Sequence, residues 1–265
     1  EVSTDEAGEL VDASGAKVTR GRSEKMSKSK KNVVDPEEII QSYGADTARL
    51  FMLSDSPPDR DLDWTDSGIE GAWRYVNRLW RLISEPPFAP AAQGTPRPAN
   101  VAGSALDVER MVHKTVATVT ADLEKFHFNK AVARVRELSN AVETLKESDA
   151  GADWVLRFAS ETLAILAGPL MPHLAEEMWA ALGHDTLIAD TAWPEADQSM
   201  LVEDTITVAV QVNGKLRGTL EIAKDADKET VEQSALMLDN VQSFITGKEV
   251  RKVIVVPNKI VNVVI

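Results

Sequence analysis

The sequence contains no cysteine, and this absence excludes two ways of stabilising a fold. Without thiols the chain has neither disulfide bonds nor a zinc site with thiolate ligands. It also lacks an apolar run near the roughly 18 residues that a membrane helix needs, and no signal-peptide pattern opens it. We therefore expect a protein of a reducing compartment, the cytoplasm, with no membrane partner and no metal site.

Basic residues are also scarce, because 29 Lys and Arg stand against 42 Asp and Glu, a formal net charge of −13. A broadly basic surface for indiscriminate nucleic-acid binding is thus excluded, although local basic patches are not. Hydrophobic residues make up 43% of the 265 residues, enough to bury a core of ordinary size. The first residue is Glu rather than Met, so we expect a piece of a longer protein.

Positive charge is concentrated in residues 25–31, whose sequence is KMSKSKK. A strong helix start follows, in which Asp35 is a capping carboxylate and Pro36 occupies the first helical position. Lysines and hydroxyls on a loop suit a substrate whose negative charge grows during reaction, as in nucleotidyl transfer from ATP. The alternatives are a solvated basic turn, a nuclear-localisation-like cluster or a general phosphate-binding patch.

Hydrophobic periodicity and helix breakers predict an α-helical bundle with short connections. Short β-prone pieces within residues 1–20 predict a fragmentary hairpin before it. The helices are predicted at residues 36–44 and 47–53, from Asp66 to a loop at 86–100, around 106–126 and 132–145, and from Asp153 to Leu182 with a break at Gly168-Pro169.

From about Thr205 the period changes to the two-residue alternation of β-strands. Asn213-Gly214 is a strong hairpin signal between the first two strands. A helix near residues 228–238 and two strands, at 250–256 and 260–265, complete a small α/β domain.

Two patterns share the helix that Asp66 opens. An apolar stripe is predicted to face the core at Ile69, Trp73, Val76, Trp80 and Ile83. A second face holds Arg74, Arg78 and Arg81, which either contact a nucleic-acid backbone or form a solvated surface.

Two polar residues are assigned structural roles. Asp46 is expected to cap the helix that begins at Thr47. His173 follows a helix break beside apolar neighbours, so we expect a buried, hydrogen-bonded core histidine.

Several segments resemble class I aminoacyl-tRNA synthetases, in the order of that family's motifs. Residues 25–29, KMSKS, resemble its signature loop, and NVVDP at 32–36 resembles the sequence that follows. PHLAEEMW at 172–179 is similar to a bundle segment shared by the leucine, isoleucine and valine enzymes. The segments that look most like bacterial leucyl-tRNA synthetases are GIEGAW at 68–73, QVNGKLRG at 211–218 and VRKVIVVPNK at 250–259.

The resemblance implies a mainly α fold with three domains. Residues 1–65 would be a remnant of the catalytic nucleotide-binding domain, 66–200 an anticodon-binding-type helical bundle, and 201–265 a small α/β tRNA-binding domain. The full-length enzyme would use ATP, with Mg as counter-ion, to form leucyl-adenylate and would bind leucine and tRNA-Leu. The family's His-x-Gly-His motif is missing, so that half of the site would lie upstream of Glu1. We expect the isolated chain to be inactive, with no cofactor bound.

The resemblance also assigns site residues. The implied ATP-binding residues are Lys25, Met26, Ser27, Lys28 and Ser29. Lys28 and Lys25 would be the catalytic lysines, whereas Lys30 and Lys31 are expected to be a solvated face. The implied tRNA-binding residues are Arg74, Arg78, Arg81, Lys215, Arg217, Arg251, Lys252 and Lys259, with scattered surface cations as the alternative for the last five.

Three other interpretations stay open. The chain would be a non-catalytic RNA-binding module with no enzymatic parent, the tRNA-binding subunit of a split synthetase, or a structural helical scaffold. A free-standing module predicts translation from a methionine near this start. The scaffold gives no reason for the lysine loop.

Overall fold

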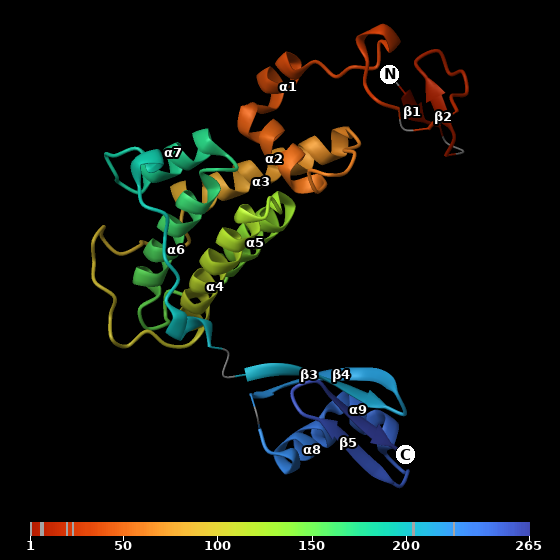
Figure 1. Cartoon of the computed structure of the whole chain (residues 1–265), viewed down its shortest axis with the longest axis vertical. Helices are drawn as coiled ribbons and strands as arrows, with labels where there is room; N and C mark the ends of the chain where they lie inside the picture. Colours follow the sequence, from red (N-terminus) through yellow and green to blue (C-terminus); the bar gives the residue numbers. More distant parts are fainter. Residues whose placement is uncertain (1, 6–7, 20, 23, 203–204, 225) are drawn as a thin grey trace. The chain divides into compact units, whose positions relative to one another are not determined.

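The computed structural model describes residues 2–5, 8–19, 21–22, 24–202, 205–224 and 226–265. It divides into two compact units, residues 1–195 and 196–265, which are described separately (Figure 1). No helix in the described part of the chain combines the length and apolar character needed to cross a membrane.

The first unit opens with a small antiparallel pair, β1 (Val2–Thr4) and β2 (Leu10–Asp12), as the turn signals predict. A short 3-10 turn, η1 (Lys28–Lys30), follows. The helices of this unit are α1 (Pro36–Tyr43), α2 (Ala45–Asp55), α3 (Asp66–Ser84), α4 (Ser104–Glu124), α5 (Phe128–Val142), α6 (Ala152–Ala167) and α7 (Pro172–Ala181), followed by the 3-10 turn η2 (Ile188–Asp190).

Local chain chemistry explains where these helices begin and end. Asp35 accepts a hydrogen bond from the Glu37 N–H at 2.9 Å and so caps α1. Thr65 caps α3 in the same way, through the Gly68 N–H at 3.2 Å. The predicted break at Gly168-Pro169 is confirmed, since α6 ends at Ala167.

The core of the first unit lies between α3, α4, α5, α6 and α7, which pack alongside one another (Figure 1). Its fully buried side chains include Leu79, Leu138, Leu156, Leu163 and Met178. Burial of this many large aliphatic side chains is the main stabilising contribution to the bundle.

The predicted core face of α3 is partly wrong. Ile69 and Ile83 are buried, but Trp73 is 43% exposed. The buried face is rotated about the helix axis and presents Tyr75 and Leu79 instead. Both faces of α3 are rich in apolar residues, so periodicity alone does not select the one that packs.

The second unit is a four-stranded sheet in the order β4-β3-β6-β5, preceded by the 3-10 turn η3 (Gln198–Leu201). β3 and β6 are parallel, and the other neighbours are antiparallel. The strands and helices are β3 (Thr205–Val212), β4 (Lys215–Ala223), α8 (Lys228–Met237), α9 (Asp239–Ile245), β5 (Lys252–Val256) and β6 (Ile260–Val264).

The predicted hairpin is confirmed, because Asn213 (φ 47°) and Gly214 (φ 76°) both have the positive φ of a two-residue turn between β3 and β4. α8 and α9 lie against the sheet (Figure 1). Val231 and Val241 of these helices share a buried cluster with Val210 of β3 and Val261 of β6. The sequence missed α9, which begins directly after α8.

Candidate functional site

Residues 25–32 form a compact turn that the side chain of Asn32 closes. Its Oδ1 accepts a hydrogen bond from the Ser27 N–H at 2.8 Å, and its Nδ2 donates to the Lys25 carbonyl at 3.4 Å. The turn η1 continues until the Lys31 N–H donates to the Lys28 carbonyl at 3.2 Å. Asn32, to which the sequence analysis gave no role, therefore links the first and third residues of KMSKS.

Three other polar side chains of this turn have partners nearby, namely Ser27, Ser29 and Lys30. The hydroxyls of Ser27 and Ser29 lie 2.7 Å apart and share a hydrogen bond. The Lys30 ammonium forms an exposed ion pair with Glu24 at 2.6 Å. Met26 is largely exposed, so its side chain is not buried in the turn.

An open groove of about 430 Å³ adjoins the turn and the start of α1. Lys28, Lys31, Val33, Asp35 and Pro36 line it. Neither lysine forms an ion pair with any residue that the structure describes. The carboxylate of Asp35 already accepts the N-terminal hydrogen bond of α1, so two unpaired ammonium groups dominate the charge of this groove.

The predicted arginine face of α3 is largely paired with carboxylates. Arg74 pairs with Glu70 at 3.6 Å. Arg78 forms a two-point ion pair with Glu143 of α5, in which the Nε–Oε1 distance is 2.7 Å. Hydrogen bonding from Arg78 lowers the pKa of Glu143 below its ordinary value of 4.5.

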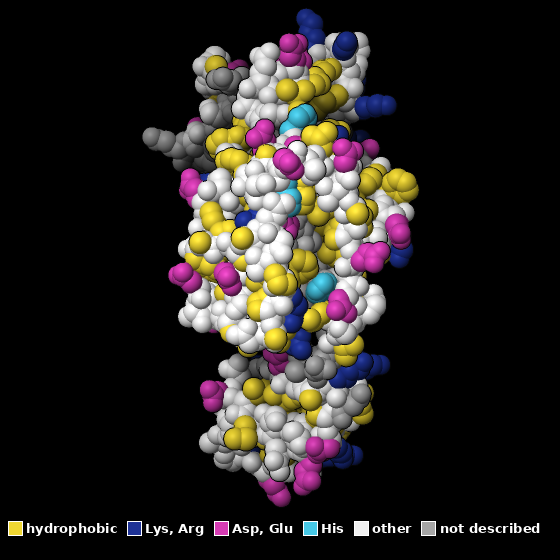
Figure 2. Space-filling model, turned by 90° about the vertical axis from the view of Figure 1, so that its left-hand side faces the viewer, with side chains coloured by type: hydrophobic (Ala, Val, Ile, Leu, Met, Phe, Trp, Pro, Cys, Tyr) yellow, Lys and Arg dark blue, Asp and Glu magenta, His cyan; other side chains and the backbone are white. Residues whose placement is uncertain are grey.

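The guanidinium of Arg81 forms no ion pair with the residues that the structure describes, and it lines a groove of about 410 Å³. Arg78, Glu85 and Glu143 line the same groove, so its formal charges cancel. On the face of the molecule that Figure 2 shows, acidic and basic side chains are interspersed. We conclude that α3 offers single cations rather than a continuous basic stripe.

In the second unit the strand register brings some predicted basic residues together. Lys215 of β4 pairs with Val212, which pairs with Val263. The neighbouring β6 residue pairs with Lys252 of β5. Lys215 and Lys252 therefore lie at the same end of the sheet, three strand spacings or about 14 Å apart.

Arg251 precedes Lys252 at this end and is exposed. Lys259 belongs to the turn between β5 and β6, at the opposite end. The side chain of Arg217 has a different environment, because its guanidinium lies 3.9 Å from the ring centre of Phe244 on α9. We define Lys215, Arg251 and Lys252 as the sheet-end cluster.

Asp46 has a role that the sequence analysis missed. It is only 7% exposed and lies in the first turn of α2. Its Oδ2 accepts a hydrogen bond from the Leu174 N–H at 2.6 Å, and its Oδ1 pairs with His173 Nδ1 at 2.9 Å. Asp46 therefore caps α7 rather than α2, and the expected role is wrong.

His173 is hydrogen-bonded as predicted, but its side chain is 78% exposed rather than buried.

Arg49 adds a second link from α2, through hydrogen bonds from its Nη2 to the Pro169 carbonyl at 3.0 Å and from its Nε to the Leu170 carbonyl at 3.4 Å. α2, which follows the lysine loop and α1, is thus fixed to the junction of α6 and α7. The sequence did indicate that α7 needs a cap from elsewhere in the chain, because the side chain of Met171, which precedes the helix, cannot cap it.

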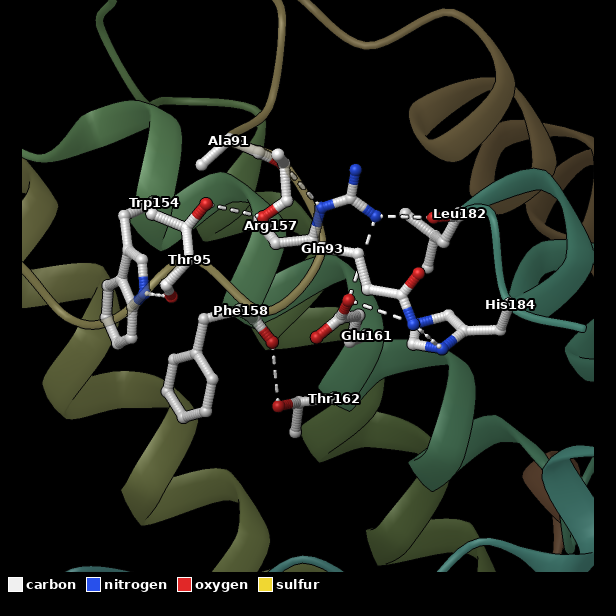
Figure 3. A network of polar contacts seen from close by, with 11 residues as sticks. Ala91, Gln93, Thr95, Trp154, Arg157, Phe158, Glu161, Thr162, Leu182 and His184 are labelled. Atoms are coloured by element: carbon white, nitrogen blue, oxygen red, sulfur yellow. Dashed lines mark hydrogen bonds and ion pairs between the residues drawn. The ribbon is translucent and has the colours of Figure 1, made fainter. Parts of the chain in front are cut away.

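A second polar network holds the long loop before α4 against α6 (Figure 3). Arg157 of α6 donates to the Ala91 carbonyl at 2.8 Å and to the Leu182 carbonyl at 2.6 Å. His184 Nε2 lies 3.0 Å from Glu161 of the same helix. These contacts satisfy carbonyls of irregular segments, and we assign the network a structural role.

Two protein-family models match the chain. "Anticodon-binding domain of tRNA ligase" matches residues 107–233, and "tRNA synthetases class I (I, L, M and V)" matches residues 15–65, which include the lysine loop.

Curated relatives match almost the whole chain. The leucine–tRNA ligase of Paramagnetospirillum magneticum is 62% identical over 259 residues, which are 97% of this chain and 30% of that protein. The leucine–tRNA ligase of Rhodospirillum rubrum is 60% identical over 251 residues, 95% of this chain and 29% of that protein. The chain thus spans about 30% of the length of these relatives.

A solved structure has the same fold. It is the LeuRS of Agrobacterium radiobacter K84 in a ternary complex with tRNA and LeuAMS, with a TM-score of 0.69 and 28% identity. The match covers 90% of this chain and 31% of that one. Sequence, family models and fold agree that almost the whole chain is similar to one part of the leucine–tRNA ligases, which are class I tRNA synthetases.

Proposed function

We propose that this chain is the part of a leucine–tRNA ligase that contributes the KMSKS loop to leucyl-adenylate formation and surfaces that bind tRNA-Leu. The observation that supports the catalytic role most directly is the position of Lys28. This lysine lies within the turn that Asn32 closes, lines an open groove and has no ion-pair partner among the described residues. An ammonium group in this state is available to a phosphate.

The reaction explains why a cation is needed there. A leucine carboxylate oxygen would form a bond to the α-phosphorus of ATP while the bond to the bridging oxygen breaks. The electron pair goes to the departing pyrophosphate, so negative charge grows on that group. Lys28, assisted by Lys25, would stabilise this charge more in the transition state than in bound ATP. Mg would enter as a counter-ion of the phosphates, which are ligands that it prefers.

The test uses a grafted enzyme, in which this chain replaces the matching segment of the Paramagnetospirillum magneticum ligase. We expect Lys28→Ala to lower kcat for leucine-dependent ATP–pyrophosphate exchange about 100-fold, with a much smaller change in the KM for ATP. The exposed Lys146→Ala is the matched control and should leave both constants unchanged. A raised KM for ATP with an unchanged kcat would show uniform binding and contradict the proposed role.

We also propose that the sheet-end cluster contacts the tRNA backbone. Lys215 and Lys252 are exposed at the same end of the sheet, and the relative from Agrobacterium radiobacter was solved with tRNA. Each phosphate contact contributes roughly 0.7 to 0.9 to the slope of log affinity against log salt. The double variant Lys215→Ala/Lys252→Ala should therefore reduce that slope by about 1.4 to 1.8 in tRNA-Leu binding.

Lys259→Ala, at the other end of the sheet, provides the comparison within the same unit. It should change the slope by less than either cluster residue. An unchanged slope in the double variant would assign the cluster to ordinary surface charge. Intact activation with no tRNA effect would restrict the proposal to its catalytic half.

A further inference from the structure

We propose that Lys31 is a second phosphate-binding lysine of the loop, acting with Lys28 on the same pyrophosphate. This inference rests on the proposed function, because it concerns the same groove and the same substrate. The sequence alone places Lys31 with Lys30 on a solvated face, whereas the structure gives these neighbouring residues different environments.

The first argument is the position of the four lysines of the loop. Lys28 and Lys31 line the groove of about 430 Å³, and Lys25 and Lys30 are not among its lining residues. Lys30 is paired with Glu24 at 2.6 Å, but Lys31 has no ion pair within the described part of the chain. Among the four lysines of the loop, Lys31 is thus the only one besides Lys28 that lines the groove and has no ion pair with a described residue.

The second argument is the backbone of Lys31. Its φ of 52° and ψ of 34° are left-handed, a conformation that glycine or asparagine adopts at lower cost than lysine. The turn itself needs only the backbone N–H of residue 31, which donates to the Lys28 carbonyl. The turn therefore gives no reason for a lysine at this position, whereas an anionic ligand in the groove does.

The third argument is the chemistry of the groove. Two ammonium groups meet one carboxylate, Asp35, which is already occupied as the cap of α1. Val33 and Pro36 supply the apolar part of the groove lining. Departing pyrophosphate has enough oxygens for both lysines. No proton transfer is needed, since the lysines only balance its growing charge.

The experiment compares Lys31→Asn with Lys30→Asn in the grafted enzyme. The two substitutions remove the same charge from adjacent positions, and asparagine tolerates the left-handed backbone at residue 31. We expect Lys31→Asn to lower kcat for ATP–pyrophosphate exchange about tenfold or more, as for loss of one charge-assisted hydrogen bond. Lys30→Asn should stay within about twofold, because exposed ion pairs contribute little.

A second variant, Lys31→Gly, separates charge from backbone. It relaxes the turn and removes the ammonium group, so the inference predicts the same loss of kcat as for Lys31→Asn. Full activity of Lys31→Gly would assign residue 31 to the turn alone and overturn the inference. Equal losses for Lys30→Asn and Lys31→Asn would also overturn it, because they would show only a general electrostatic effect.

The outcome for Lys28→Ala distinguishes this inference from the proposed function. If Lys28→Ala is impaired and Lys31→Asn is not, the second lysine is excluded and the loop keeps its role. If neither variant is impaired, both proposals fail. A double variant adds a further check, since two lysines on one pyrophosphate should give losses that are not simply additive.

Discussion

Asp46→Ala removes the carboxylate that joins α2 to α7, and the structure sets the size of its effect. Two hydrogen bonds are lost, at 2.6 Å to the Leu174 N–H and 2.9 Å to His173. Loss of a helix cap costs about 0.5–2 kcal/mol, and loss of a hydrogen bond to a charged group about 1.5–3 kcal/mol. Because the two effects overlap at one carboxylate, we expect the free energy of unfolding to fall by about 2–4 kcal/mol.

Urea denaturation followed by tryptophan fluorescence measures this change. All six tryptophans lie before residue 196, so the signal reports the first unit alone. The matched control is Asp35→Ala, which removes the exposed cap of α1 and should cost about 0.5–1 kcal/mol. His173→Ala should also cost less than about 1 kcal/mol, because that side chain is 78% exposed. Equal losses for Asp46→Ala and Asp35→Ala would refute the proposed anchoring of α7.

Two further predictions concern packing and charge. Gly68→Ala should destabilise the first unit by about 1–3 kcal/mol, because a Cβ there would meet the buried Phe51 ring at 2.5 Å. Gly71→Ala should instead stabilise α3 by up to about 1 kcal/mol, because the nearest atom to its Cβ is 3.8 Å away. The urea midpoints of the two variants check this. Glu143→Gln should cost less than about 1 kcal/mol at pH 7, since the Arg78–Glu143 pair is 47% and 35% exposed. The folded-state pKa of Glu143 is lowered, so the contribution of the pair is present above pH 4.5 and is lost as the pH falls through the folded pKa. A destabilisation by Glu143→Gln that does not shrink as the pH falls below 4.5 would contradict this origin.

The features that the sequence predicted correctly depend on neighbouring residues. Asp35-Pro36 starts α1, and Asn213-Gly214 forms a hairpin, because each signal acts within about one turn of chain. The family resemblance of residues 25–29 is likewise readable from the sequence, because these residues are contiguous.

The features that the sequence missed depend on contacts between distant segments. Asp46 and Leu174 are 128 positions apart, so no local pattern shows that one caps the helix of the other. The choice of Tyr75 over Trp73 for the core depends on where α5 lies, since the Tyr75 hydroxyl shares a hydrogen bond with Ser139 of that helix at 3.2 Å. The sequence predicted that Arg217 binds nucleic acid, and it could not show that the Arg217 guanidinium lies against the ring of Phe244.

The environments of Lys30 and Lys31 show that sequence patterns can also miss differences between adjacent residues. Both residues are lysines in an exposed turn, and composition cannot tell them apart. The left-handed backbone at residue 31 and the carboxylate of Glu24 separate them. The two lysines thus differ in features that composition does not show.

Leucine-dependent ATP–pyrophosphate exchange, measured for the isolated chain and for the grafted enzyme, tests the central claim most directly. The chain has no His-x-Gly-His sequence, so we predict no exchange from it alone and restored exchange when the rest of a leucine–tRNA ligase is joined to it. A folded but inert graft, or measurable exchange by the isolated chain, would contradict the assignment of this chain as one half of an adenylate-forming site.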